Sequence, residues 1–529
     1  MSETARPVSG GAPTDEAHTG AGSDLKNSAD FGARTSSDEP EKTALDGDLK
    51  EIVQIVDWEG PDDPENPKNW TFRKKWSAML IVSAFTFISP VSSSMVAPAA
   101  QQISDQFGIT SSAIAAMTIS VFVLAYAVGP LFLGPLSEMY GRAPVLQISN
   151  MWYFAWNLGC GFAQNTGQLI AFRFLAGLGG SAPLAVGGGT VGDLFSPDQR
   201  GKAMALYSMA PLLGPIIGPI AGAWIAERST WRWVFYSTTI ADAVVQAMGL
   251  LFLRETYAPR LLQYKAQRIR LGMDEEKANR VKVRTVFETA DRTPRALFRK
   301  AIVRAFVLFG TEPIVQLFGI YMAFVYGILY LFLTTIPSIF RDNYHESTGI
   351  LGLHYIPLGL GLFTASQVNS RLLDKTYAHF KAKNGGVGKP EFRLPSAMPG
   401  TCVLPIGILM AGWAAQKHVH WIVVDIGIFL VGASVIVIFQ GFQTYVVDAF
   451  TLHAASALAA VSFLRSLAGF GFPLFGPAMY NALGFGKGDT ILAVVAIVLG
   501  IPAPWVFWLY GERIRNASRN ARHDLPRAS

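Results

Sequence analysis

Residues 420–448 read HWIVVDIGIFLVGASVIVIFQGFQTYVVD, and Asp425 and Asp448 are the only Asp, Glu, Lys or Arg among them. About 20 helical residues are enough to cross the hydrocarbon core of a bilayer, so this run predicts a transmembrane helix. It is longer than that core requires, which predicts tilt or an extension beyond the bilayer. Similar apolar runs recur along the chain, and they decide its class.

Twelve such runs lie between residues 77 and 510, and they predict an all-α membrane protein with twelve transmembrane helices in two six-helix halves. Half of the chain is hydrophobic (50%) and only 16% is charged, whereas soluble proteins carry about 25% charged residues. This composition excludes a soluble enzyme and a nucleic-acid-binding module. The predicted spans are 77–98, 113–133, 143–163, 167–191, 202–226, 233–253, 305–336, 350–372, 396–416, 420–448, 455–482 and 489–510.

The charges outside the spans predict the domain organisation. Residues 1–76 are rich in Gly, Ser, Asp and Glu and predict a disordered cytosolic tail. Six-helix bundles are expected at 77–253 and 305–510, a charged helical cytosolic linker at 254–304 and a cytosolic tail at 511–529. With both termini in the cytosol, 37 of the 44 Lys and Arg residues face inward, as the positive-inside rule requires.

A weak internal repeat relates the two halves. Asp193 closes the fourth span and Asp448 closes the tenth, and at the same offset Gly214 corresponds to Gly469. Two related six-helix halves are what a transporter needs to expose one site to alternate sides of a membrane. Both acids are expected at the cytosolic face, as partners in a gate.

No cofactor, metal or nucleotide site is predicted. None of the three Gly-Lys pairs is followed by the Ser or Thr of a P-loop, and both cysteines lie in apolar runs. We therefore expect a non-enzyme whose partners are a small organic substrate, protons and the lipid bilayer, with no nucleotide and no nucleic acid. Transport would use an ion gradient or be passive; a channel is disfavoured, because channels tend to be symmetric oligomers.

The segment between the second and third spans reads GPLSEMYGR at residues 134–142. Gly134 and Gly141 are expected to bracket a tight cytosolic turn, in which Glu138 and Arg142 pair with the opposite half in one conformation and release it in another. The alternative is a simple positive-inside anchor, which Arg142 alone would supply.

The fifth span reads GPIIGPIAG at residues 214–222. Glycines at every fourth position form a stripe that allows close helix approach, and the prolines bend the helix. Ordinary small-residue packing would look the same, but we expect this stripe at a hinge between the halves. The motif residues are Gly214, Pro215, Gly218, Pro219 and Gly222.

Two of the 44 Lys and Arg residues, Arg173 and Arg465, are assigned to neither side, and they are the only cations expected inside the membrane. A cation in the membrane is costly unless it faces a polar cavity or an acid. Arg173 is therefore a candidate for proton coupling, with snorkelling to the outer interface as the alternative, and Arg465 is assigned to the gate.

These three motifs (134–142, Arg173 with its following glycines, and 214–222) resemble motifs of the major facilitator superfamily. The segments 57–67, 254–259 and 325–330 are similar to fungal twelve-span drug:proton antiporters. The resemblance implies proton-coupled antiport and export of drugs, polyamines or self-made toxins. Glu138 and Ala143 depart from the superfamily pattern, which usually has Asp and a second base at these positions.

The proton carrier is expected among the acids within the spans. Asp242 lies near the middle of the sixth span, and Glu312 is expected two turns into the seventh. Either could take up a proton near neutral pH, because burial disfavours the charged carboxylate. The alternative for both is a hydrogen-bonded structural acid. Asp425 is expected in contact with water at the outer end of its span.

One face of the seventh span predicts a substrate cavity. Glu312, Gly319 and Ala323 share this face with Gln316, Tyr326 and Tyr330, and Gln440 and Gln443 of the tenth span add amides. A cavity lined by aromatic and amide groups, with few fixed charges, suits organic molecules that are amphipathic, neutral or cationic. The alternative is that the tyrosines form an interfacial belt.

The leading interpretation is an exporter that exchanges its substrate for protons in the plasma membrane, with the vacuolar membrane as the alternative location. A proton symporter that imports a nutrient has the same fold, and a non-transporting membrane receptor is the third possibility. The span-five motif and the lack of a dense polar array for a sugar argue against import.

Overall fold

The computed structural model describes residues 52–274, 281–287, 303–304, 306–450 and 454–518. The first 51 residues of the predicted N-terminal tail, residues 275–280 and 288–302 of the predicted linker, residue 305 and residues 519–529 of the predicted C-terminal tail lie outside the described residues.

The N-terminal half contains six spans. One of them is broken at Ser181, where α5 passes into α6, and α2 is a short helix that follows the first span. The helices are α1 (Phe72–Ser94), α2 (Ala100–Phe107), α3 (Ser112–Tyr140), α4 (Arg142–Gly161), α5 (Thr166–Gly180), α6 (Ala182–Leu194), α7 (Pro197–Arg228) and α8 (Arg232–Phe252), with a 3-10 turn η2 (Ala97–Ala99).

The C-terminal half also contains six spans. Its helices are α12 (Pro313–Ser338), α13 (Thr348–Leu351), α14 (Tyr355–Lys383), α15 (Met398–Gln416), α16 (Trp421–Ala449), α17 (Ala454–Gly500) and α18 (Pro502–Ala517). Three short helical segments connect them, namely the π-helical η3 (Ile339–Asn343), η4 (Gly352–His354) and η5 (Pro390–Ser396). Gly484, with φ +78°, reverses the chain inside α17, which therefore holds the eleventh span and most of the twelfth.

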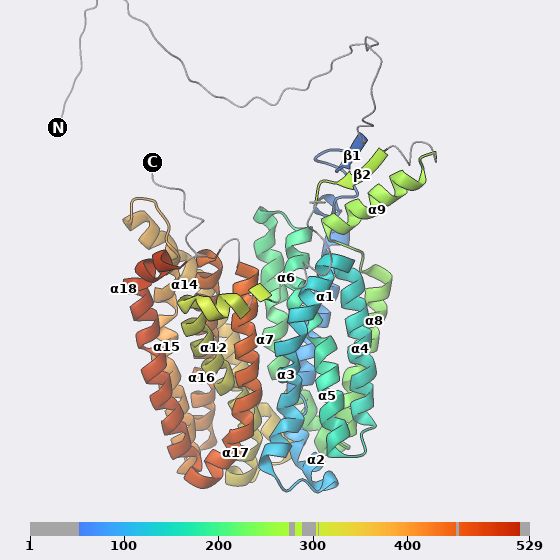
Figure 1. Cartoon of the computed structure of the whole chain (residues 1–529). Coiled ribbons are helices and arrows are strands. Elements are labelled where there is room, and N and C mark those ends of the chain that lie inside the picture. Colours follow the sequence, from blue (N-terminus) through green and yellow to red (C-terminus); the bar gives the residue numbers. More distant parts are fainter. Residues whose placement is uncertain (1–51, 275–280, 288–302, 305, 451–453, 519–529) are drawn as a thin grey trace, which may run out of the picture. The chain divides into compact units, whose positions relative to one another are not determined.

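The predicted fold class is confirmed. Ten stretches of the described residues are long and apolar enough to cross a membrane. One of them contains the two spans that meet at Gly484, and α4 supplies a further helix of 20 residues. We call the side at which α1 begins and α18 ends the terminal side, and the opposite side the distal side (Figure 1).

Two expectations about the segments outside the membrane are wrong in part. Residues 52–76 are ordered, because Ile52–Val56 form strand β1 and α1 begins at Phe72. The predicted linker is not only helical. It contains α9 (Ala258–Leu271) and a strand β2 (Val281–Thr285), which pairs in parallel with β1 from Ile52↔Val281 to Val56↔Thr285. Both strands are only five residues long, IVQIV and VKVRT, and such short runs are easily missed beside charged segments.

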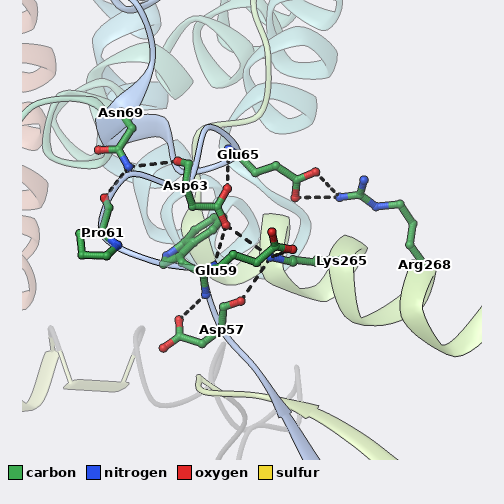
Figure 2. A network of polar contacts seen from close by, with 9 residues as sticks. Asp57, Glu59, Pro61, Asp63, Glu65, Asn69, Lys265 and Arg268 are labelled. Carbon is green, nitrogen blue, oxygen red and sulfur yellow. Dashed lines mark hydrogen bonds and ion pairs between the residues drawn. The ribbon is translucent and has the colours of Figure 1, made fainter. Parts of the chain in front are cut away.

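A loop between β1 and α1 is organised around the Asp63 carboxylate (Figure 2). This group accepts hydrogen bonds from the backbone N–H of Glu59 (2.9 Å) and of Glu65 (2.8 Å). The Glu59 hydrogen bond is the main cause that lowers the pKa of Asp63, followed by the bonds from Glu65 and Lys265, which together outweigh burial. Asn69 closes the loop by donating to the carbonyl of Asp63 (3.0 Å).

This loop holds the linker helix α9. Lys265 lies 3.3 Å from Asp63 and 3.1 Å from Glu59, and Arg268 lies 3.0 Å from Glu65. Figure 2 shows both cations of α9 pointing toward the acids of the loop. With the β1–β2 pairing, these contacts attach the linker to the segment that leads into the N-terminal half.

Candidate transport site

The predicted turn at residues 134–142 is wrong in shape. Residues 134–140 continue α3, and the chain breaks only at Gly141, which has φ +104°. Glu138 is exposed, and a side chain at Gly134 would meet open space. The acid of the motif therefore lies at the end of α3 and the base at the start of α4, on either side of the break at Gly141.

Arg142 pairs with Asp193, at 3.2 Å between Nε and Oδ2. Its Nη1 donates to Ser137 Oγ (2.6 Å), and its guanidinium lies over the ring of Tyr257 at 4.7 Å. All these partners belong to the N-terminal half or to the start of the linker. The structure thus brings two predicted gate residues together within one half rather than across the halves.

Glu255 completes this cluster, and the sequence analysis did not assign it to the site. Its carboxylate accepts hydrogen bonds from the backbone N–H of Arg142 (2.9 Å), Ala143 (3.2 Å), Thr256 (2.9 Å) and Tyr257 (2.8 Å). It therefore caps the first turn of α4, where unpaired N–H groups and the helix dipole favour an anion. The one feature of the sequence that could have indicated Glu255 is its position in the segment 254–259, which is similar to fungal drug:proton antiporters.

Asp448 occupies the corresponding position in the C-terminal half. It pairs with Arg393 at 2.9 Å, and Arg393 also lies 3.1 Å from Asp374. Two further ion pairs tie the same connection to α18, Lys389–Glu512 (2.8 Å) and Arg515–Glu391 (3.1 Å). Arg393 was not predicted, because nothing in the local pattern of residues 384–397 singles it out.

The glycine stripe of α7 packs on α1, a helix of the same half. A Cβ at Gly214 would lie 2.6 Å from Pro90 Cβ, and one at Gly218 would lie 2.7 Å from the carbonyl oxygen of Val91. A Cβ at Gly222 would meet the backbone of Met95. The expected close approach is present, but the stripe itself does not form a hinge between the halves.

Another face of α7 contacts the C-terminal half near the distal side. A Cβ at Gly352 would meet Ala223, and one at Gly359 would lie 2.5 Å from the side chain of Ile216. At the same side, Ser93 Oγ of α1 lies 3.3 Å from the Tyr330 hydroxyl of α12. The two halves are therefore joined on the distal side in this conformation.

Arg173 is fully buried, and backbone carbonyls surround it. Its guanidinium donates to the carbonyl oxygens of Ser92 (3.3 Å), Ser93 (3.1 Å) and Ile119 (3.1 Å). The rings of Phe122 and Phe235 lie 5.2 Å and 5.8 Å from it. These contacts link α5 to α1 and α3, and the snorkelling alternative is wrong.

Asp242 is also fully buried, in a polar cluster between α8 and α4. Asn150 Nδ2 donates to Asp242 Oδ1 (3.0 Å) and to Gln246 Oε1 (2.7 Å), and Gln246 donates to Gln147 Oε1 (2.8 Å). Asp242 Oδ2 has no hydrogen-bond partner among the described residues. This acid lies within the N-terminal half, away from the face where α12 meets α1.

Glu312 is not two turns into a helix, as expected. It is the N-cap of α12, with φ −108° and ψ 105°, and residues 306–311 form a separate helical turn before it. The cause is Pro313, because a residue that precedes proline is disfavoured in the α conformation. Gln316 donates to the carbonyl of Gly310 (3.2 Å) near this break.

Aromatic rings of the C-terminal half form a cluster around one cation, and this cluster contacts the N-terminal half at Ser93. The Arg465 guanidinium of α17 lies 4.7 Å from the ring centre of Tyr326 and 5.6 Å from that of Phe439. The rings of Tyr326 and Tyr330 lie 4.9 Å apart. Gly469 completes the cluster, since its Cβ would touch Tyr326 of α12 and Val123 of α3. We call Tyr326, Tyr330, Phe439, Arg465 and Ser93 the central cluster.

Neither of the two predicted amides of α16, Gln440 and Gln443, is part of this cluster. Gln440 donates to Ser366 Oγ (2.7 Å) and accepts from Asn369 (3.0 Å), so it links α16 to α14. Gln443 is half-buried. Of the predicted cavity face, Tyr326 and Tyr330 thus come together, whereas Glu312 and Gln440 have other partners or positions.

Two further buried acids, Asp425 and Asp489, lie near the distal side. Asp425 is buried rather than in contact with water, because His354 Nδ1 lies 2.9 Å from it while His354 Nε2 lies 2.7 Å from Glu346. Asp489 was missed; it is 2% exposed and accepts from the Tyr480 hydroxyl (2.6 Å). The glycines at 484, 486 and 488 mark the chain reversal that buries it.

Comparison with known proteins places these features in a family. A family model described as Major Facilitator Superfamily matches residues 82–473. The efflux pump vrtL of Penicillium aethiopicum is 46% identical over 508 residues, covering 95% of this chain and 98% of that protein. The efflux pump radE of Floropilus chiversii is 39% identical over 489 residues, covering 92% and 88%.

Solved structures support the fold. A bacterial homologue of the lysosomal transporter Spinster, in an inward-facing conformation, gives a TM-score of 0.60 at 14% identity and covers 85% of this chain and 99% of that one. The xylose transporter XylE of E. coli, partially occluded and inward open, gives 0.60 at 14% identity and covers 83% and 98%.

Proposed function

Because this chain belongs to the major facilitator superfamily, we propose that it is a proton-coupled antiporter that exports small amphipathic organic molecules. It is a multi-pass membrane protein and a secondary transporter of fungal efflux type. To this family assignment the proposal adds three things: that transport is export, that it is coupled to protons, and that the substrates are small amphipathic organic molecules. The observation that carries it is the likeness to fungal proteins named efflux pumps, over 95% of this chain.

The proposed orientation has the terminal side in the cytosol of a plasma membrane. The 37 Lys and Arg residues that this orientation places inside support it. Contacts between the halves near the distal side would then close the protein toward the exterior. The pairs Arg142–Asp193 and Arg393–Asp448 each stay within one half, which fits a conformer that receives substrate from the cytosol.

This orientation is tested by labelling a single cysteine at Gln267, an exposed residue of α9. In a variant with both native cysteines, Cys160 and Cys402, replaced by Ser, a membrane-impermeant maleimide should label Gln267→Cys only after the cells are permeabilised. Labelling on intact cells would show that the terminal side faces the exterior.

Proton coupling is proposed to use Asp242 or Glu312, both nearly fully buried. A neutral carboxyl is far less costly in such surroundings than a carboxylate, so a proton taken up there changes the preferred conformation. Arg173 would act by holding α5, α1 and α3 in position during this change, through its three carbonyl contacts.

The test is uphill transport in sealed inside-out vesicles that contain the full-length protein. Dyes such as fluorescein and rhodamine 6G should accumulate when the lumen is acidified, and a protonophore should abolish the accumulation. At least one of Asp242→Asn and Glu312→Gln should lose uphill transport but still bind dye. Accumulation without a proton gradient would refute coupling, and dye leaving the lumen together with protons would indicate a symporter.

A further inference from the structure

Arg465 is the basic residue of the central cluster, and its environment differs from that of Arg173. It lies eleven residues after the first residue of α17, about 16 Å along the helix. Arg173 donates to three carbonyl oxygens. Arg465 has no ion pair and no hydrogen bond among the described residues, and its Nε is buried without an acceptor.

Aromatic rings alone do not satisfy this side chain. A cation over a ring gains about 0.5–2 kcal/mol, but the five N–H donors of a guanidinium lie in its plane and need oxygen acceptors. The guanidinium of Arg465 lies over the rings of Tyr326 and Phe439, which offer no oxygen acceptor in its plane. The side chain is half-buried, so part of the planar fork is open to a ligand.

We propose that Arg465 recognises the carboxylate of an aromatic organic acid, which is the substrate class of this exporter. A guanidinium binds a planar oxyanion through two parallel hydrogen bonds, and this geometry gives specificity as well as affinity. The rings of Tyr326, Tyr330 and Phe439 supply flat apolar surfaces beside it.

This inference rests on the proposed function and narrows it. The cavity face of the seventh span favours neutral or cationic molecules, since it carries no fixed positive charge. The structure adds a permanent cation to that face from α17, because Arg465 stays charged at every physiological pH. A cationic substrate would lie beside it at a cost, whereas an aromatic acid would supply the missing acceptor.

The alternative is the gate role, in which Arg465 pairs with an acid of the protein in another conformer. The two roles differ in what the loss of the charge does. A gate residue changes the transport of every substrate by a similar factor. A recognition residue changes the ratio between charged and uncharged relatives of one molecule.

The experiment measures binding to the purified full-length protein with two matched pairs of probes. One pair is 1-naphthaleneacetate with 1-naphthaleneacetamide, and the other is fluorescein with rhodamine 6G. In the unaltered protein each acid should bind about tenfold more tightly than its neutral or cationic partner. In Arg465→Gln the ratio should fall to within about twofold, and Arg465→Lys should keep part of it, because lysine offers a point charge without the fork.

Lys417→Gln is the control, because it removes one exposed positive charge at the distal side and should leave the ratio unchanged. The assignment is overturned if the amide or rhodamine 6G binds as tightly as its acid partner, or if neither acid binds at millimolar concentration. It is also overturned if Arg465→Gln weakens all four probes equally. Proton-driven export of rhodamine 6G with no acid preference would leave the proposed function intact, whereas acid preference without proton dependence would refute coupling alone.

Discussion

On the terminal side, the two halves stabilise the connection between their second and third spans with an ion pair at the same position but with different additional contacts. In each half an acid at the end of the fourth span pairs with an arginine at or just before the start of the third, Asp193 with Arg142 and Asp448 with Arg393. The N-terminal half adds one carboxylate that accepts four backbone N–H groups, whereas the C-terminal half adds ion pairs between side chains. The repeat thus conserves the position of the acid but not the way in which the connection is held.

The largest effect should follow from filling the stripe of the N-terminal half. Gly218→Leu places a branched side chain against the backbone of α1, which cannot move aside as a side chain can. We expect little folded protein and no export, measured by size-exclusion profile and vesicle flux. Gly471→Leu on α17 has open space and should keep the normal profile; equal loss in both variants would show that glycine flexibility, rather than contact, matters.

The next effect compares the two supporting acids. Glu255→Gln leaves one acceptor oxygen for four backbone N–H groups, and should cost about 2 kcal/mol of stability. Glu512→Gln removes one ion pair whose acid is half exposed, and should cost less than about 1 kcal/mol. Thermal unfolding of the purified variants measures both. Equal shifts in Tm would mean that the backbone cap is no stronger than the surface pair.

A smaller effect compares the paired acids at the ends of α6 and α16. Asp193→Asn leaves the guanidinium of Arg142 with no carboxylate partner among the described residues, whereas Asp448→Asn leaves Arg393 paired with the carboxylate of Asp374. The initial rate of export should therefore fall more in Asp193→Asn. The reverse order would indicate that the C-terminal pair controls the conformational change.

The smallest effect concerns the loop that holds α9, a device that the described residues show in the N-terminal half alone. The pKa of Asp63 is lowered, mainly by the Glu59 N–H, so its stabilising effect is complete above the unfolded value of about 3.9 and is lost as pH falls through the folded value. Hydrogen exchange of α9 should rise only in that acidic range. Asp63→Asn should show fast exchange already at neutral pH; protection that persists would assign the anchoring to the β1–β2 pairing and to the ion pairs of Glu59 and Glu65.

The sequence predicts the spans well, because each depends on a local property, the length of an apolar run. It predicts the acids of the terminal side from their repeat, but not Arg393 or Glu255, whose roles depend on where connections fold back. For Glu312 the sequence does carry a signal, because the proline that follows it favours the start of a helix there. Asp489 stands at the first position of a predicted span, and only the reversal at Gly484 explains its burial against Tyr480.

The anchored linker changes the effective length of the connection between the halves. Because β2 pairs with β1 and α9 is held by the Asp63 loop, the chain up to Thr285 moves with the segment that precedes α1. The tether that limits how far the halves separate therefore starts after Thr285, not at the end of α8. A residue inserted before α9 would leave the reach of this tether unchanged, whereas one inserted after β2 would lengthen it and lower the effective concentration of one half near the other.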